Sequence, residues 1–221
     1  MSRSPKPVPD PWSPRLSALY DCDDLVPTDG LRVEATRLTR TDWSGCRAAQ
    51  VDLEGSHLVK VRLTQAEPRL FRARDTLFEE CDLSGADLSE SSLYRVEFRG
   101  CKMIGFVAGG AKFERVRFVD CQLEMSSLRA LEAEDCEFRS SDMRDSDFEM
   151  AVLERVSFGK CQLGGTSFRQ ARMQDVDLRS SEVSGLRYVH GLKGATIEPI
   201  QLFDLADAMA REIGIVVTGD R

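Results

Sequence analysis

Cysteine and histidine are the residues of this sequence most suited to chemistry, because both can ligate metals and take part in catalysis. The seven cysteines are Cys22, Cys46, Cys81, Cys101, Cys121, Cys136 and Cys161. No two of them form a Cys-x-x-Cys pair, and neither histidine, His57 or His190, lies at metal-ligand spacing from a cysteine. An odd number of cysteines in a chain without an export signal favours reduced thiols. We therefore expect no metal, no other cofactor and no disulfide framework.

Other catalytic patterns are missing from the sequence or arise by accident. There is no glycine-rich phosphate loop, no Gly-x-Ser-x-Gly elbow and no histidine-based triad. Ser157 and Lys160 match a Ser-x-x-Lys motif, but Phe158 between them belongs to the apolar repeat described below. Asp142, Asp145 and Asp147 could offer oxygen ligands to a cation. The repeat separates these three acids, so turn-favouring acids on a solvated surface are the simpler interpretation. The sequence indicates a protein that is not an enzyme.

Charge and hydropathy exclude two further classes. The net charge of −7 argues against direct nucleic-acid binding, which needs lysine and arginine to neutralise phosphates, although it suits a partner with a basic surface. No stretch approaches the roughly 20 consecutive apolar residues of a membrane helix. Residues 1–14 are rich in proline and lack the apolar core of a signal peptide. We expect a cytoplasmic protein with no membrane association.

A repeat of five residues dominates the chain. Every fifth residue from Phe78 to Leu178 is large and apolar, and 19 of these 21 positions hold Leu, Phe or Met. Two residues before each, from Thr76 to Val176, 19 of 21 positions hold Ala, Cys, Ser, Thr or Val. The two small residues at large positions, Ala108 and Ala133, coincide with large residues at the neighbouring small positions, Phe106 and Leu131. Such compensation is what a core of fixed volume requires.

A period of five fits neither a helix nor a single strand, so the chain must turn a corner at every repeat. Four such sides close a square coil, and the sequence carries the second, fourfold longer period that this coil requires. Glycines at 85, 105, 165 and 185 mark one corner, where a positive φ costs glycine little. Cysteines at 81, 101, 121 and 161 form a column, in which inward thiols would act as small, inert, protonated apolar groups. The proposed structural core is a column of stacked rings: Phe78, Phe98, Phe118, Phe138 and Phe158.

The segments Cys81-Asp82-Leu83-Ser84-Gly85 and Ala86-Asp87-Leu88-Ser89-Glu90 resemble the A-(D/N)-L-x-x signature of the pentapeptide-repeat family. The resemblance covers about residues 31–190. It implies an all-β fold, the right-handed quadrilateral β-helix, and the handedness rests on the resemblance alone.

Three regions follow from this pattern. Residues 1–30 form a proline-rich leader and N-terminal cap, in which Trp12, Leu16, Leu19 and Tyr20 could pack on the first coil. Residues 31–190 form about eight coils, with a distorted coil or bulge between Gln65 and Asp75, where Pro68 and Ala73 occupy large positions. Residues 191–221 form an amphipathic capping α-helix that starts with Pro199 at its first turn and ends at Gly214, followed by a strand-like Ile215–Val217.

The apolar stripe of this helix consists of Leu202, Leu205, Met209 and Ile213. It could simply cap the core. Because C-terminal helices dimerise some members of the family that the chain resembles, a homodimer through this helix is an equally weighted alternative.

One segment is unusually acidic. Residues 120–154 contain 11 acidic residues against three arginines, Arg129, Arg139 and Arg144, which leaves a charge of −8. Folded into coils, these acids form a belt around the rod, densest on the side shared by Glu132, Glu134 and Asp135. We name as the acidic belt, and as the candidate partner-binding residues, Glu132, Glu134, Asp135, Glu137, Asp142, Asp145, Asp147 and Glu149.

Two functions remain open. The resemblance to the mycobacterial fluoroquinolone-resistance and Qnr-type members of the family implies a DNA mimic that binds DNA gyrase or topoisomerase IV and protects it from drugs or toxins. A mimic should carry an acidic stripe along the rod, whereas the sequence predicts a belt. The alternative is a structural or adaptor module with an apolar docking patch drawn from Ile104, Val107, Val119, Met125, Met150 and Val152.

Overall fold

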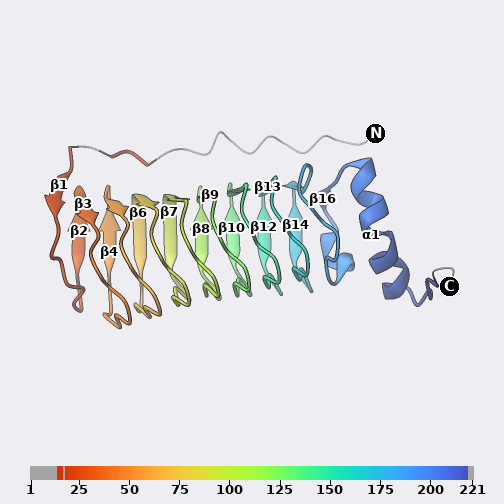
Figure 1. The fold of residues 1–221 in the computed structure, drawn as a ribbon, viewed down its shortest axis with the longest axis horizontal. Coiled ribbons are helices and arrows are strands. Elements are labelled where there is room, and N and C mark those ends of the chain that lie inside the picture. Colours follow the sequence, from red (N-terminus) through yellow and green to blue (C-terminus); the bar gives the residue numbers. More distant parts are fainter. Residues whose placement is uncertain (1–13, 17, 219–221) are drawn as a thin grey trace.

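The computed structural model describes residues 14–16 and 18–218, and the chain there forms a rod of stacked coils with a helix at one end (Figure 1). The strands are two to eight residues long and all pair in parallel. Among the described residues, no helix is long and apolar enough to cross a membrane.

Two sides of the rod carry the paired strands. One side, here called the β9 side, contains β1 (Tyr20–Cys22), β3 (Thr36–Thr39), β5 (His57–Val59), β9 (Arg117–Val119), β11 (Glu137–Arg139), β13 (Ser157–Gly159), β15 (Val176–Asp177) and β16 (Ala195–Thr196). The adjacent β8 side contains β2 (Arg32–Glu34), β4 (Asp52–Glu54), β8 (Lys112–Glu114), β10 (Glu132–Glu134), β12 (Val152–Glu154) and β14 (Arg172–Gln174). The longer strands β6 (Arg72–Glu79) and β7 (Ser92–Arg99) pass around the corner and belong to both sides. The remaining two sides are held by single bridges such as Asp82 to Lys102 and Asp87 to Val107.

The register confirms the predicted coil of four repeats. Phe98 pairs with Phe78 and Phe118, and Leu93 pairs with Ala73 and Phe113. The parallel β-solenoid has about nine turns, one more than predicted, because β1 already pairs with β3 (Tyr20 with Thr36) ahead of the regular repeat. The predicted glycine corner has positive φ, but Gln65, Met125 and Asp145 also adopt a positive φ at that corner. Stacking therefore imposes the left-handed conformation even on side chains that disfavour it.

The phenylalanine column is confirmed as the core. Successive rings from Phe78 to Phe158 stack with centroids 4.7–4.9 Å apart, and all five are fully buried. Offset stacking and near-complete burial make each ring a large contributor to stability. The strand spacing of about 4.8 Å is also a favourable ring spacing, so backbone and core impose the same repeat.

The predicted distortion between Gln65 and Asp75 is not found. Ala49 bridges to Arg69 and Leu53 pairs with Ala73, and both pairs keep the regular offset of one full coil. The small Ala73 is matched by the buried Phe71, which repeats the compensation seen at Phe106 and Leu131. An exchange of large and small residues within one side keeps the volume of the coil constant and leaves the backbone undisturbed.

The C-terminal end is covered by a 3-10 turn, η1 (Val189–Leu192), and by α1 (Pro199–Glu212). Gly191 is required here, because a Cβ at this position would lie 1.9 Å from the carbonyl oxygen of Phe168. Pro199 stands in the first turn and Gly214 follows the helix end with a φ of +83°, as predicted. No strand is assigned to Ile215–Val217 in the described structure.

The predicted apolar stripe of α1 is only partly correct. Leu205 is buried and Met209 is half-buried, but Leu202 and Ile213 are exposed. Gln201 takes the inward place instead, and its Nε2 donates hydrogen bonds to the carbonyls of Leu178 (2.8 Å) and Ser181 (2.7 Å). The last coil presents carbonyl groups that need donors, so a polar side chain is the better cap.

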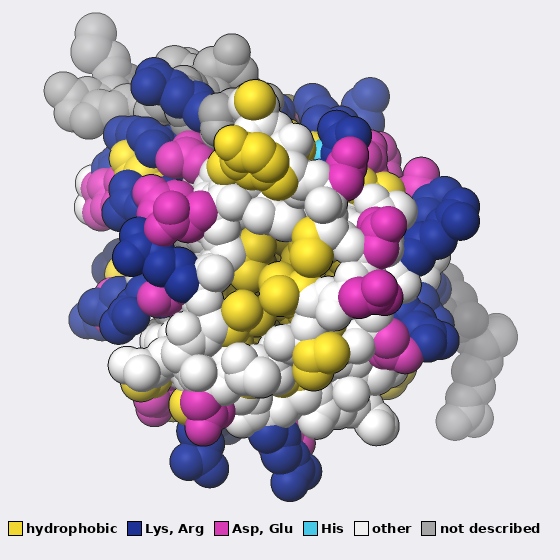
Figure 2. Space-filling view, turned by 90° about the vertical axis from the view of Figure 1, so that its left-hand side faces the viewer, with side chains coloured by type: hydrophobic (Ala, Val, Ile, Leu, Met, Phe, Trp, Pro, Cys, Tyr) yellow, Lys and Arg dark blue, Asp and Glu magenta, His cyan; other side chains and the backbone are white. Residues whose placement is uncertain are grey.

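The N-terminal end is more open than the predicted cap. Figure 2 shows apolar side chains in the middle of this end. Leu25 and Leu31 are half-buried against the core, whereas Tyr20 and Val26 are exposed. Leu16 and Leu19 are half-buried, and Trp12 lies outside the described residues.

Phe118→Asp should prevent folding, because it places a carboxylate in the middle of the ring column without a hydrogen-bond partner. Gln122→Asp, at an exposed position of the same coil, is the matched control and should fold normally. Circular dichroism and size-exclusion chromatography distinguish the two. A soluble Phe118→Asp protein with native strand content would contradict the assigned core.

Candidate functional site

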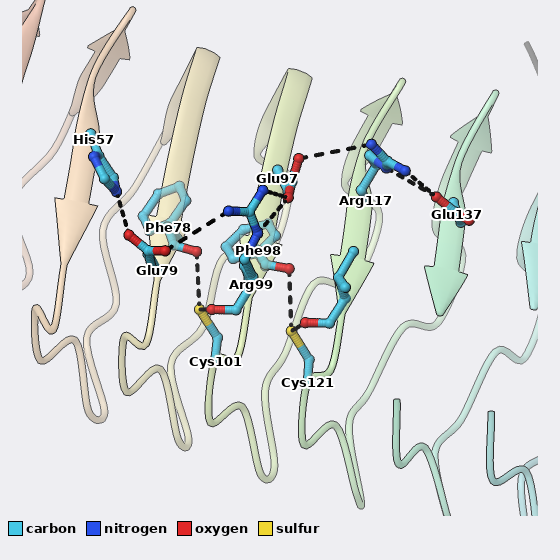
Figure 3. A network of polar contacts seen from close by, with 11 residues as sticks. His57, Phe78, Glu79, Glu97, Phe98, Arg99, Cys101, Arg117, Cys121 and Glu137 are labelled. Carbon is cyan, nitrogen blue, oxygen red and sulfur yellow. Dashed lines mark hydrogen bonds and ion pairs between the residues drawn. The ribbon is translucent and has the colours of Figure 1, made fainter. Parts of the chain in front are cut away.

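The cysteine column contains no reactive thiol. Cys81, Cys101 and Cys121 are buried, and the sulfurs of Cys101 and Cys121 lie 3.4 Å from the carbonyl oxygens of Phe78 and Phe98 (Figure 3). Burial raises the pKa of Cys136 to about 12 and that of Cys161 to about 11. These thiols remain protonated at neutral pH and serve as small core groups. Among the described residues, no cluster of three His, Cys, Asp or Glu side chains could hold a metal ion.

The acidic belt is neutralised far more than the sequence suggests. Arg155 donates to Asp135 and also bonds Glu134 and Glu154. Arg117 bonds Glu137 (2.9 Å) and Lys112 lies 3.0 Å from Glu132. These cations come from neighbouring coils, because stacking places each residue beside its equivalents in the coils before and after it. The predicted charge of −8 includes only the arginines within the segment and therefore omits this pairing.

Individual belt residues therefore differ in what they offer a partner. Asp135 is only 7% exposed, and its hydrogen bond raises the pKa of Arg155 above its ordinary value, so it is a structural carboxylate. Asp142 bonds Arg144 (2.5 Å), which lowers the pKa of Asp142. Asp147 and Glu149 share Arg129 at 3.0 and 2.6 Å. Glu132, Glu134 and Asp145 remain exposed.

The β8 side contains a shallow groove of about 570 Å³ that gathers the exposed carboxylates. Its walls include Glu114, Glu132, Glu134 and Glu154 from three successive coils. In the strand register Glu134 lies directly between Glu114 and Glu154. These three form a short stripe of acid along the rod axis, which we call the glutamate stripe. Sequence reasoning missed it, although glutamates at 114, 134 and 154 recur with the coil period that the core had already indicated.

The glutamate stripe is only partly neutralised. Like charges directly opposite on paired strands repel, but Arg155 bonds Glu134 and Glu154 and so offsets part of this repulsion. Glu114 is exposed at the end of the stripe. A stripe of this kind suits a partner that brings its own cations.

The other end of the groove is lined by Arg74 and Tyr94, which belong to a cluster of arginines around the Tyr94 ring. The guanidinium carbons of Arg74, Arg95 and Arg115 lie 4.6, 4.5 and 5.8 Å from the centre of the Tyr94 ring, within cation–π range. Arg115 also donates to the Tyr94 hydroxyl (3.2 Å), and Arg95 is held by Asp75. The groove thus runs from a tyrosine–arginine cluster to the glutamate stripe.

A polar network occupies the neighbouring β9 side (Figure 3). His57 contacts Glu79 at 3.0 Å, Arg99 lies between Glu79 and Glu97, and Arg117 joins Glu97 to Glu137. The alternation of acid and base along this side is what stacked coils favour. The network positions charges but contains no nucleophile activated by a base.

The predicted apolar docking patch does not form one surface. Val119 belongs to β9 and is buried, whereas Val152 belongs to β12 on the β8 side. Val107 bridges to Asp87 and Ser127 on a third side, and Met125 and Met150 are exposed at different corners.

Comparison with known families agrees with the repeat. A family model described as "Pentapeptide repeats (8 copies)" matches residues 74–107, and one described as "Pentapeptide repeat region" matches residues 111–188. Together the two models cover about half of the chain. The search of curated proteins gives no match.

Three solved structures illustrate the likeness. A trypsin-treated variant of QnrB1, a plasmid-mediated fluoroquinolone resistance protein, is 21% identical with a TM-score of 0.51 and covers 90% of this chain and 99% of its own. Full-length QnrB1 is 20% identical, has a TM-score of 0.52 and covers 87% and 95%. HetL, a pentapeptide repeat protein involved in heterocyst differentiation regulation from a Nostoc cyanobacterium, is 18% identical, has a TM-score of 0.33 and covers 76% and 90%. The likeness to QnrB1 shows a shared fold.

Thiol reactivity tests the assignment of the cysteine column. In the native protein a disulfide reagent such as Ellman's should react with the half-buried Cys22 and Cys46, while the five buried thiols stay protonated and unreactive. All seven should react in guanidinium chloride. Rapid native labelling of Cys101 or Cys136, located by mass spectrometry, would contradict an inert core.

Proposed function

The chain belongs to the pentapeptide-repeat family, and on that premise we propose that it is a cytoplasmic, non-enzymatic binding protein that presents one side of a rigid rod to a protein partner. A solenoid suits this role, because each side is a flat array whose side chains are fixed by the coils above and below. The groove on the β8 side supports this role, because its charged side chains project from strands that pair with the coils on both sides.

The partner that we propose is a bacterial type II topoisomerase, DNA gyrase or topoisomerase IV, bound through DNA mimicry. The observation that carries this proposal is the glutamate stripe. Its carboxylates repeat along the rod about every 4.8 Å, somewhat wider than the ~3.4 Å rise between phosphates of one DNA strand. Lysine and arginine residues that normally hold phosphates could pair with such carboxylates. The fold shared with QnrB1, a fluoroquinolone resistance protein, is consistent with protection of a drug target.

A second candidate function is an adaptor whose partner carries both signs of charge. The tyrosine–arginine cluster favours it, because a DNA mimic gains nothing from basic residues. On the β8 side, three successive coils carry five basic and two acidic residues at positions 72–75, 92–95 and 112–115. The next coil carries three acids at 132–135 and no base. A partner that binds along the whole groove would need an acidic region and a basic region side by side.

Removing the exposed carboxylates tests the mimic. The intact protein should inhibit gyrase supercoiling, or protect gyrase from a fluoroquinolone, at micromolar concentration or below. The triple variant Glu114→Gln, Glu132→Gln, Glu134→Gln should raise the effective concentration at least about tenfold, ~1.4 kcal/mol of lost binding. Asp135 is left unchanged, because it is buried against Arg155 and serves the fold.

The matched control is Glu80→Gln, Glu90→Gln, Glu182→Gln, which removes three exposed charges away from the groove. It should keep full activity. Equal activity of both triple variants would exclude Glu114, Glu132 and Glu134 as the residues that bind gyrase. An intact protein with no effect on supercoiling or on drug action would direct attention to the adaptor function.

We propose further that the protein forms a homodimer through its C-terminal helix. Beyond the face that caps the core, α1 and the residues after it expose an apolar surface of Ile200, Leu202, Phe203, Ile213, Ile215, Val216 and Val217. Phe203 is 77% exposed and adjoins the exposed Leu202, so the first turn of α1 offers an apolar contact for association.

Phe203→Glu should therefore weaken dimerisation without altering the solenoid, since Phe203 makes no contribution to the buried core. Sedimentation equilibrium should show a concentration-dependent dimer for the intact protein and a monomer for the variant. Gln174→Glu, which adds the same charge at an exposed site in β14, should leave the dimer intact. A monomeric intact protein at all concentrations would refute the dimer.

A further inference from the structure

Three arginines from three successive coils converge on one tyrosine at the edge of the β8 side. The guanidinium groups of Arg74 and Arg95 lie over the Tyr94 ring, and Arg115 donates to its hydroxyl (3.2 Å). Arg74 pairs in register with Tyr94 on the next coil, and Arg115 follows β8 on the coil after that. Like charges this close repel one another, so the tyrosine–arginine cluster requires anions to neutralise it.

Within the described part of the chain, a carboxylate neutralises only one of these three arginines. Arg95 donates to both carboxylate oxygens of Asp75, at 2.8 and 2.5 Å, and Asp75 is 9% exposed. The guanidinium contacts of Arg74 and Arg115 with described residues are made to Tyr94, and no described carboxylate pairs with either group. Two positive charges are therefore left uncompensated beside one aromatic ring.

The tyrosine–arginine cluster stands between two hollows of the β8 side. Arg74 and Tyr94 line both the groove of about 570 Å³ and a second hollow of about 220 Å³ on the coils nearer the N-terminal end. An extended chain that crosses the cluster thus has room on both sides of it. Asp75 already holds Arg95, and the Tyr94 hydroxyl holds Arg115, so binding to these arginines costs little side-chain entropy.

We propose that the tyrosine–arginine cluster binds an acidic peptide segment of a protein partner, with one carboxylate on Arg74 and a second on Arg115. Guanidinium groups pair with carboxylates through two parallel hydrogen bonds. The two arginines are two coils apart, about 10 Å along the rod. Carboxylates about two or three residues apart in an extended chain would reach both of them. This inference rests on the proposed binding role of the β8 side, but it does not depend on which protein is the partner.

A nucleic acid fits the cluster less well than an acidic peptide. Guanidinium groups already lie over the Tyr94 ring, where a base would have to stack. Tyr94 also pairs in register with Glu114, where the glutamate stripe begins. A phosphate backbone that continued along the groove would be repelled by this stripe, whereas a short acidic segment ends before it.

Titration of the isotope-labelled full chain with a capped hexaglutamate peptide tests the site. At low salt the side-chain Nε–Hε signals of Arg74 and Arg115 should shift and saturate, whereas a capped hexaglutamine peptide should shift neither. Arg74→Ala combined with Arg115→Ala should weaken binding at least about tenfold. The matched control is Arg40→Ala combined with Arg139→Ala, because both residues are exposed and lie outside both hollows. Arg40 has a positive φ, as Arg115 does, so the two double variants disturb the backbone alike.

Three results would each overturn the proposal. They are the absence of a saturable shift, equal weakening by the two double variants, and tighter binding of a single-stranded thymidine hexamer than of hexaglutamate. The last result would assign the cluster to nucleic acid. No topoisomerase enters this assay, so a protein that has no effect on gyrase but binds hexaglutamate through Arg74 and Arg115 upholds the site.

Discussion

The structure depends on one constraint: each coil must place the same volume inside the same square, because the next coil stacks on it at the strand spacing of about 4.8 Å. The ring column from Phe78 to Phe158 meets this constraint with identical residues. The pairs Phe106 with Ala108 and Leu131 with Ala133 meet it by exchange. The same stacking orders the outer surface, since each outward residue lies beside its equivalents in the coils before and after it. Ion pairs such as Arg155 with Asp135, and the unfavourable alignment of Glu114, Glu134 and Glu154, both follow.

The requirement for a constant volume in each coil explains which features the sequence could predict. The inward positions have a strict volume rule, so their five-residue pattern indicated the register, the square coil and the buried thiols. The outward positions obey no volume rule, and their pairing becomes visible only when the sequence is folded coil by coil. Counting charges within residues 120–154 leaves out Arg155 and Lys112, which lie outside that segment but pair with its acids. Such a count also does not reveal the glutamate stripe, whose members lie in successive coils. At the helix, amphipathic spacing placed Leu202 inward, but the carbonyls of Leu178 and Ser181 required a donor and Gln201 took the position. Hydrophobic periodicity identifies the apolar face of a helix, but it does not indicate where buried carbonyl groups require a hydrogen-bond donor.

The candidate site combines a regular strand framework with an uneven distribution of charge. Glutamates aligned on paired strands repel one another, and Arg155 offsets this repulsion for Glu134 and Glu154. The tyrosine–arginine cluster at the other end of the groove gives the β8 side a polarity along the rod, which would orient the proposed partner. The β9 side differs, because its charges alternate and largely satisfy one another. The β8 side is therefore the side on which we place the proposed partner.

The most direct test of this account is equilibrium binding of the intact protein to purified bacterial gyrase holoenzyme, with linear duplex DNA titrated as a competitor. If the glutamate stripe takes the place of phosphates, binding should be saturable, should weaken as salt rises, and should be displaced by DNA. Binding that persists undiminished in saturating DNA, or an absence of binding at low salt, would contradict DNA mimicry by this protein.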